Sequence, residues 1–132
     1  MLNLLLLQFE LLAKYLSFLM AYDEFLQERI SRVLDEKHTS FVAKKMMGGL
    51  VFMINDKMCL GIVKDEMMAR INPDIYEDSL LKEGCSEMNF TGTSMKGFVF
   101  LSPDAIDMET DLDYWVQLCL DFNPFAKSSK KK

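Results

Sequence analysis

The sequence predicts a two-layer α+β domain, in which an antiparallel sheet of five to six strands carries helices packed on one face. Two groups of short apolar runs are separated by turn residues, and amphipathic helical stripes flank them on both sides. Neighbouring strands joined by such short turns pair antiparallel. The chain has no β-α-β unit with a glycine fingerprint, so the sequence does not favour a parallel nucleotide-binding sheet.

The length and composition fit one globular domain with an acidic body. The chain has 132 residues, half of them hydrophobic, and a net charge of -5. Removing the four lysines of residues 127–132 from that sum leaves -9. Such a body repels phosphates at long range, so we expect no strong nucleic-acid binding by it. Three widely spaced cysteines predict reduced thiols and a cytoplasmic location.

Residues 1–19 differ from the rest of the chain and predict a helix that is apolar on most of its surface. Its polar residues form one narrow stripe: Asn3, Glu10, Lys14 and Ser17. The segment is either an added packing helix, a membrane-associated helix, or translated sequence upstream of a start at Met20. We do not expect membrane association, because Glu10 and Lys14 lie near the middle of the segment. A packing helix could contact its own sheet or a second copy, which leaves a homodimer open.

Residues 22–36 predict the first helix of the domain. Leu26, Ile30 and Val33 recur at helical spacing on one face, and charged residues occupy the other. Asp23 is placed to cap the helix N-terminus.

The next segment predicts a meander of strands near residues 41–47, 49–55 and 57–63. The Gly48-Gly49 pair separates the first strand from the second. Asn55-Asp56 lies between two apolar runs, and both residue types tolerate the positive φ of a two-residue hairpin turn. A fourth strand is expected over residues 67–71.

A cap-then-proline pattern predicts two further helical starts. Asn72-Pro73 begins a helix that should run to about Lys82, with Gly84 after its end. Strands are expected at residues 86–90 and 97–101. Ser102-Pro103 then begins a short helical turn.

The last helix is expected to begin at a capping box that starts with Thr110 and to run to about Phe122. Its apolar stripe includes Trp115, and Asn123-Pro124 stops it. Residues 126–132 predict a disordered basic tail. The chain therefore divides into an N-terminal extension (1–19), one domain (20–125) and a tail (126–132).

Residue patterns do not predict an enzyme, a cofactor or a metal site. The loop of residues 92–97 lacks the spacing of a phosphate-binding loop, and the acidic residues between 104 and 113 lack calcium-loop spacing. The residues that could support a partner-binding patch are Lys44, Lys45, Lys57 and Lys96.

Several short motifs together resemble one protein family. Lys45-Met46-Met47-Gly48-Gly49 followed by Phe52 and Gly61 looks like the R-x-M-F-G-G … F … F-G core of the TfoX/Sxy N-terminal domain. Later segments also resemble small stand-alone members of that family; they are Met88-Asn89-Phe90, Met95-Lys96-Gly97-Phe98-Val99, Pro103, and Leu112 with Tyr114-Trp115 through Asn123-Pro124. The match spans about residues 20–125.

The resemblance implies a fold similar to secretion-chaperone domains and a bacterial regulator of competence that acts as a transcriptional co-activator. It marks five residues as structural: Gly48, Gly49, Gly61, Gly97 and Trp115. We therefore expect a non-enzymatic regulatory domain that binds a protein partner, such as a transcription component. The alternative is a small-ligand-binding or enzymatic domain with a cleft between sheet and helices.

Overall fold

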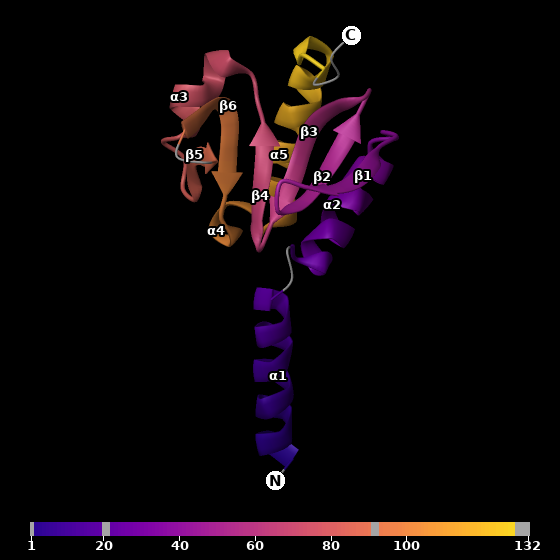
Figure 1. The fold of residues 1–132 in the computed structure, drawn as a ribbon, viewed down its shortest axis with the longest axis vertical. Helices are drawn as coiled ribbons and strands as arrows, with labels where there is room; N and C mark the ends of the chain where they lie inside the picture. The colour runs from indigo at the N-terminus through magenta and orange to yellow at the C-terminus, as the bar shows by residue number, and fades with distance from the viewer. Residues whose placement is uncertain (1, 20–21, 91–92, 129–132) are drawn as a thin grey trace.

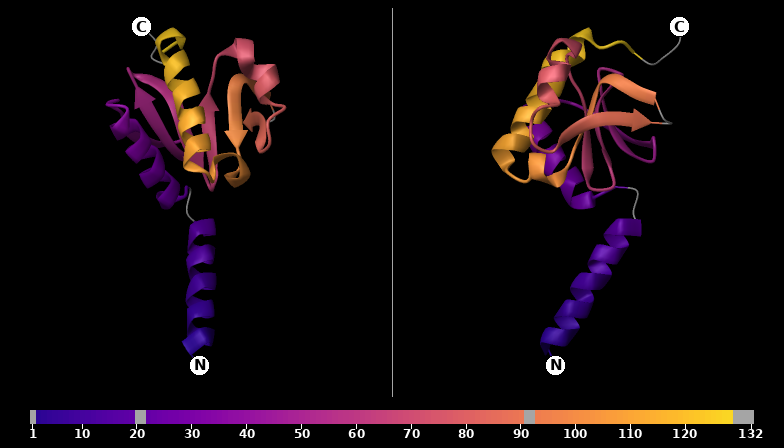
Figure 2. Two further views of the ribbon diagram at one scale, coloured as in Figure 1. Left: turned by 180° about the vertical axis from the view of Figure 1, so that it is seen from behind. Right: turned by 90° about the vertical axis from the view of Figure 1, so that its left-hand side faces the viewer.

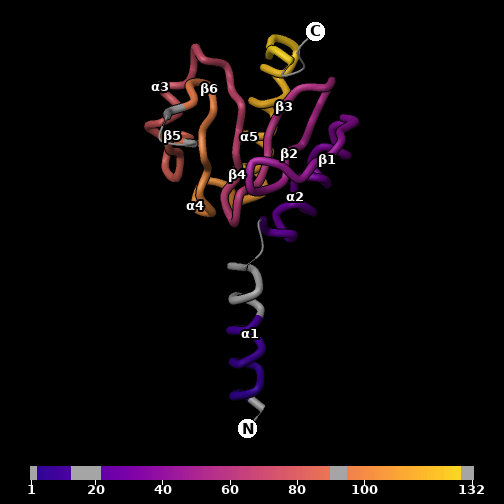
Figure 3. The backbone as a smooth tube through the Cα atoms, viewed as in Figure 1, coloured from indigo at the N-terminus to yellow at the C-terminus, as the bar shows by residue number. Residues whose placement is uncertain are grey.

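The computed structural model describes residues 2–19, 22–90 and 93–128, with side chains described for residues 3–12, 22–89 and 95–128. Figure 1 shows the chain as a ribbon, and Figure 3 traces its backbone. The helices are α1 (Leu2–Leu19), α2 (Glu24–Glu36), α3 (Tyr76–Ser79), α4 (Pro103–Ile106) and α5 (Glu109–Phe122), with 3₁₀ turns at Pro73–Ile75 and Asn123–Phe125. The strands are β1 (Val42–Met46), β2 (Gly49–Ile54), β3 (Lys57–Val63), β4 (Glu66–Arg70), β5 (Cys85–Phe90) and β6 (Thr93–Leu101).

The six strands form one sheet in the order β1-β2-β3-β4-β6-β5, and every neighbouring pair is antiparallel. The chain leaves the centre of the sheet after β4, passes through α3, forms the edge strand β5 and returns through β6. Helices α2 and α5 cover the face that lies behind the sheet in Figure 1 and in front of it in the left view of Figure 2. The predicted α+β class is confirmed.

The main core lies between this sheet face and the helices. Alternate residues of β2 to β4, such as Phe52, Leu60 and Met67, point into it and have no exposed surface. The helices contribute the predicted stripes, with Ile30 from α2 and Leu112 from α5 equally buried.

Two tight turns set the register of the meander. Asn55 and Asp56 have φ values of 54° and 61°, which is the predicted two-residue hairpin geometry. In the preceding hairpin the turn residues are Met47 and Gly48, with φ values of 56° and 73°, and Gly49 already belongs to β2. The break between the strands therefore lies one residue earlier than the glycine pair indicates.

The helix expected over residues 73–82 is much shorter. A 3₁₀ turn at Pro73–Ile75 leads into α3, which ends at Ser79. Asn72 does cap the start, since its side chain accepts a hydrogen bond from the Asp74 amide at 2.9 Å. The chain has to turn at Gly84, whose carbonyl accepts from the Ser102 amide at 2.8 Å, and this pairing starts β5 beside the end of β6.

The expected capping box at Thr110 is wrong. Helix α5 begins at Glu109, its N-cap is Met108, and no side chain caps it. Glu109, the first residue of α5, instead accepts a hydrogen bond from Arg29 Nε of α2 at 2.7 Å.

Arg29 joins α2 to the start of α5, and the residue pattern of α2 does not single it out. Its side chain is buried, and Nη2 donates to the carbonyl oxygens of Ile106 at 2.6 Å and Asp107 at 3.1 Å. These carbonyls lie at the end of α4, where backbone acceptors need partners. One guanidinium thus ties three helices together.

The end of α5 is held to the β2–β3 hairpin by polar side chains. Asn123 Nδ2 donates to the Ile54 carbonyl at 3.1 Å, and Asn123 Oδ1 accepts from Asn55 Nδ2 at 2.9 Å. Lys57 Nζ donates to the carbonyls of Asn123 and Pro124 at 3.1 and 3.2 Å. The chain after α5 therefore remains against the sheet, and Ala126, expected in the tail, is buried. Residues 129–132 of that tail lie outside the described residues.

Helix α1 lies apart from the sheet and the other helices (Figures 1 and 2). Its apolar side chains between residues 4 and 12 are exposed, from 54% for Leu7 and Leu12 to 70% for Phe9. After α1, the chain is attached to the sheet at Lys64. Tyr22 pairs with Lys64, and the Asp23 amide donates to the Lys64 carbonyl at 2.7 Å. Within the described residues, none of the helices combines the length and apolarity required for a membrane crossing.

Candidate protein-interaction surface

The sheet face opposite α2 and α5 carries a second apolar cluster, and we call this face the open face. None of the described helices packs on it, and it faces the viewer in Figure 1. Its central residues are Val51, Met68 and Met88, which are at most 2% exposed. The partly buried residues packed around them are Met47, Met53, Met58, Met95, Phe98 and Phe100.

The curvature of the sheet buries the centre of this cluster without a covering helix. The β1–β2 and β5–β6 hairpins both project to the side away from the helices (Figure 2, right). Met47 in the first turn and Met95 on β6 pack against the cluster from those two hairpins. Between them, Gly61 makes room for Met68, because a Cβ there would lie 3.0 Å from Met68 Cε and 2.7 Å from the Leu50 carbonyl oxygen.

Methionine dominates the open face, and this determines what the face can do. A methionine side chain has three rotatable bonds and a polarisable sulfur, so it adapts to differently shaped apolar partners. Six of the nine cluster members are methionines. An apolar surface of this kind, partly exposed on a folded domain, is typical of a protein-binding site.

A shallow pocket of about 210 Å³ adjoins the open face where β4 ends and β6 begins. Its lining includes three cations and three aromatic rings: Arg70, Lys96, Lys127, Phe98, Phe122 and Phe125. The lining contains no carboxylate. Because Phe98 also belongs to the open-face cluster, the pocket and the face are continuous. We call this pocket the basic pocket.

Arg70 is held in place within the basic pocket. Its Nη1 donates to the Met58 carbonyl at 3.2 Å, and its guanidinium carbon lies 5.2 Å from the centre of the Phe98 ring. Burial lowers the pKa of Arg70 below its usual value. A guanidinium has five N–H donors, so this arrangement leaves donors for a ligand.

Backbone geometry brings the other parts of the basic pocket together. Gly97 has a φ of 92°, which disfavours other residues, and its carbonyl accepts from the Ile71 amide at 2.9 Å. This places Lys96 and Phe98 beside the end of β4. The contacts of Asn123 and Lys57 at the end of α5 bring Phe125 and Lys127 to the same place.

The four lysines expected to form a partner-binding patch occupy different places. Lys44 lies opposite Val51 on the open-face side of β1, while Lys45, opposite Leu50, projects to the other side. Lys57 holds the end of α5, and Lys96 lines the basic pocket. Lys44 thus lies on the edge strand β1, and Lys96 lies on β6, the strand next to the other edge strand, β5. Arg70 was not singled out in the sequence, and Lys127 was assigned only to the basic tail, because both join Lys96 only through long-range contacts.

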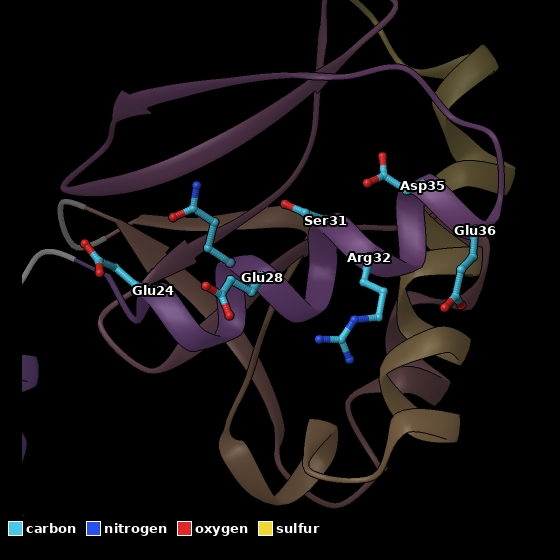
Figure 4. Close-up of a pocket in the computed structure, with 7 residues that line it drawn as sticks. Glu24, Glu28, Ser31, Arg32, Asp35 and Glu36 are labelled. Atoms are coloured by element: carbon cyan, nitrogen blue, oxygen red, sulfur yellow. The ribbon is translucent and has the colours of Figure 1, made fainter.

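The outer surface of α2 is a second hollowed region with charged side chains. The labelled residues in Figure 4 are Glu24, Glu28, Ser31, Arg32, Asp35 and Glu36, and all come from one helix. Their side chains spread along the helix and do not converge on one point (Figure 4). This is the solvated face of an amphipathic helix.

The described residues offer little nucleophilic or metal-binding chemistry. All three cysteines are free; burial raises the pKa of Cys59 to about 12 and that of Cys85 to about 11. Burial also raises the pKa of Cys119 well above its usual value, with a smaller contribution from nearby Cys59. Thiols with raised pKa values are poor nucleophiles at neutral pH. Among the described residues there is no group of three His, Cys, Asp or Glu side chains that could hold a metal ion.

Comparison with known families gives one match. The TfoX N-terminal domain family matches residues 34–123, which include the whole sheet and α5. No curated protein and no solved structure matches the chain significantly.

Proposed function

Because this chain belongs to the TfoX N-terminal domain family, we propose that it is a non-enzymatic regulatory domain that acts by binding another protein through its open face. The observation that carries this proposal is the methionine-rich cluster on a sheet face that no described helix covers. A regulator that works by contact needs such an adaptable apolar surface rather than catalytic groups.

The partner is proposed to be a component of the transcription apparatus, and the location to be the cytoplasm. The first follows from what the family resemblance implies about competence regulation and co-activation. The second is supported by the three free cysteines, which are typical of a reducing compartment.

The alternative, a ligand-binding or catalytic cleft between sheet and helices, has weaker support. The space in which that cleft would lie holds side chains with no exposed surface, including Leu60, Ile62 and Val116. The partly exposed methionine cluster instead lies on the opposite face of the sheet, and the basic pocket adjoins that face.

Site-specific photo-crosslinking in cells tests this function. A photoreactive phenylalanine analogue replaces Met58 on the open face, and a matched control replaces Arg32 on the outer surface of α2. We expect one specific protein to crosslink to position 58 and not to position 32. The mass of the crosslinked species also distinguishes a different protein from a second copy of this chain.

Loss of that crosslink in a Met53→Lys background would confirm that the contact depends on the apolar surface, provided that the circular dichroism spectrum is unchanged. Equal crosslinking from both positions, or none from position 58, would contradict the proposal.

A further inference from the structure

The basic pocket has a charge opposite to that of the protein around it. The chain carries 20 acidic and 15 basic residues, yet the lining of this pocket contains three cations and no carboxylate. In the described part of the chain neither Lys96 nor Lys127 forms a salt bridge. An uncompensated group of cations beside an apolar surface is complementary to an acidic ligand that also has apolar parts.

We propose that the partner segment that binds the open face is acidic and apolar, and that its carboxylates enter the basic pocket while its apolar side chains contact the methionines. This inference rests on the proposed function and adds the chemistry of the partner. Arg70 is already oriented by the Met58 carbonyl and the Phe98 ring, so its binding a carboxylate costs little side-chain entropy. A guanidinium with free N–H donors also suits carboxylate recognition.

The number of cations favours acidic side chains over a single chain terminus. Three positive groups from β4, β6 and the segment after α5 surround one small pocket. One terminal carboxylate would leave most of that charge unpaired, whereas two or more Asp or Glu side chains of one segment would balance it. The neighbouring rings of Phe98, Phe122 and Phe125 would contact the apolar residues between them.

A nucleic acid is the other polyanion that cations and aromatic rings can bind. The net charge of -5 disfavours it, because a duplex or long strand presents many phosphates to the acidic body as well as to the pocket. A short peptide segment carries only a few charges and meets much less of that repulsion.

Fluorescence anisotropy with the full chain tests the proposal. The probe is a labelled, acetylated and amidated peptide, Asp-Leu-Phe-Asp-Met-Leu-Asp. One control peptide replaces each Asp by Asn, and another replaces the apolar residues by Ser. A single-stranded and a duplex oligonucleotide complete the set. We expect the acidic apolar probe to bind, and to bind more weakly as salt is raised.

The decisive variant is Lys96→Glu/Lys127→Glu, since both side chains are exposed. We expect it to weaken binding of the probe by about tenfold. The matched control, Lys45→Glu/Lys82→Glu, makes the same change of charge outside the pocket and should change affinity by less than about twofold. Thermal unfolding confirms that both variants remain folded.

The outcomes separate this inference from the function on which it rests. Equal weakening by both double variants, equal binding of the Asn peptide, or no binding at about 1 mM probe overturns the acidic-partner assignment. If an oligonucleotide binds more tightly with the same dependence on Lys96 and Lys127, the pocket is a nucleic-acid site. The acidic-partner assignment is also overturned if position 58 crosslinks to a second copy of this chain and the peptide probe does not compete with that crosslink. Met53→Lys tests the proposed function separately. If this change leaves binding of the probe unaffected, the open face is not the binding surface.

Discussion

The two faces of the sheet are both apolar, but they differ in side-chain shape and in exposure. The helix-covered face contains mainly branched and aromatic residues that have almost no exposed surface, whereas the open face contains mainly methionine and phenylalanine that are partly exposed. Branched side chains with few rotamers specify one packing arrangement, and methionine adapts to several. The covered face therefore specifies the fold, and the open face is the one that we propose for recognition.

The largest expected effect comes from a matched pair of phenylalanine truncations. Phe52→Ala should lower the free energy of unfolding by about 4 kcal/mol, because Phe52 is fully buried and packs against Phe41. Phe100→Ala on the open face should cost about half as much, since its side chain is only partly buried. Urea denaturation measures both values. Equal losses of free energy would show that side chains on the open face stabilise the fold as strongly as those on the covered face, and would contradict the comparison.

Substitution of two arginines, one on each side of the sheet, tests the same comparison of the two faces. Arg29→Ala removes the partner of two carbonyl oxygens at the end of α4 and should destabilise the domain by about 2 kcal/mol. The bond to Glu109 adds little to this, because that carboxylate is mostly exposed. Arg70→Ala on the open-face side should cost about 1 kcal/mol, for one carbonyl bond and one ring contact. Thermal unfolding of the two variants checks the order.

The buried thiols of the covered face make the free energy of unfolding depend on pH in the alkaline range. The folded chain keeps Cys59 neutral up to a pKa of about 12, whereas an unfolded thiol ionises near 9.0. The stabilisation due to this raised pKa is therefore complete below about pH 9 and is lost as the pH rises toward 12, at about 1.4 kcal/mol per pH unit for each such thiol. Unfolding measured at several alkaline pH values should show this slope, and Cys59→Ala/Cys119→Ala should reduce it. An unchanged slope in that variant would assign it to other groups.

The smallest expected effects are those of single methionine truncations at the edge of the open-face cluster. Met53→Ala and Met58→Ala should each cost about 1 kcal/mol or less, because solvent already reaches both side chains. Met67→Ala, at a fully buried position on the covered face, should cost about 3 kcal/mol. Chemical denaturation of the three variants provides the comparison. A cost for Met58→Ala close to that for Met67→Ala would contradict the proposed division between the faces.

Local residue patterns predicted the elements whose structure depends on near neighbours. The Asn55-Asp56 turn, the Asp23 cap and the stripe of α2 are confirmed, since each depends on residues within a few positions of one another. The start of α5 was predicted wrongly: the helix begins at Glu109 without a side-chain cap, and the contact of Glu109 with Arg29, 80 positions away, cannot be seen in a local pattern. The full length of β6, which begins at Thr93, was missed because its pairing with β5 extends it.

The candidate site was less predictable for the same reason. Lys96 and Lys44 were singled out as cations, but their placement beside an apolar face depends on which side of each strand they occupy. A one-residue change of register reverses that side. Eleven methionines signalled an unusual composition. Only the register of the strands shows that six of them gather on one face.

The attachment points of the chain have a practical consequence for anyone who immobilises or labels this domain. The segment before α2 joins the sheet at Lys64, beside the start of β4, whereas Phe125 and Lys127 lie near the end of that strand. A fluorophore or surface tether placed ahead of Tyr22 will stand clear of the cationic recess. One placed after Ser128 will follow closely on Lys127, which lines that recess, and is the poorer choice.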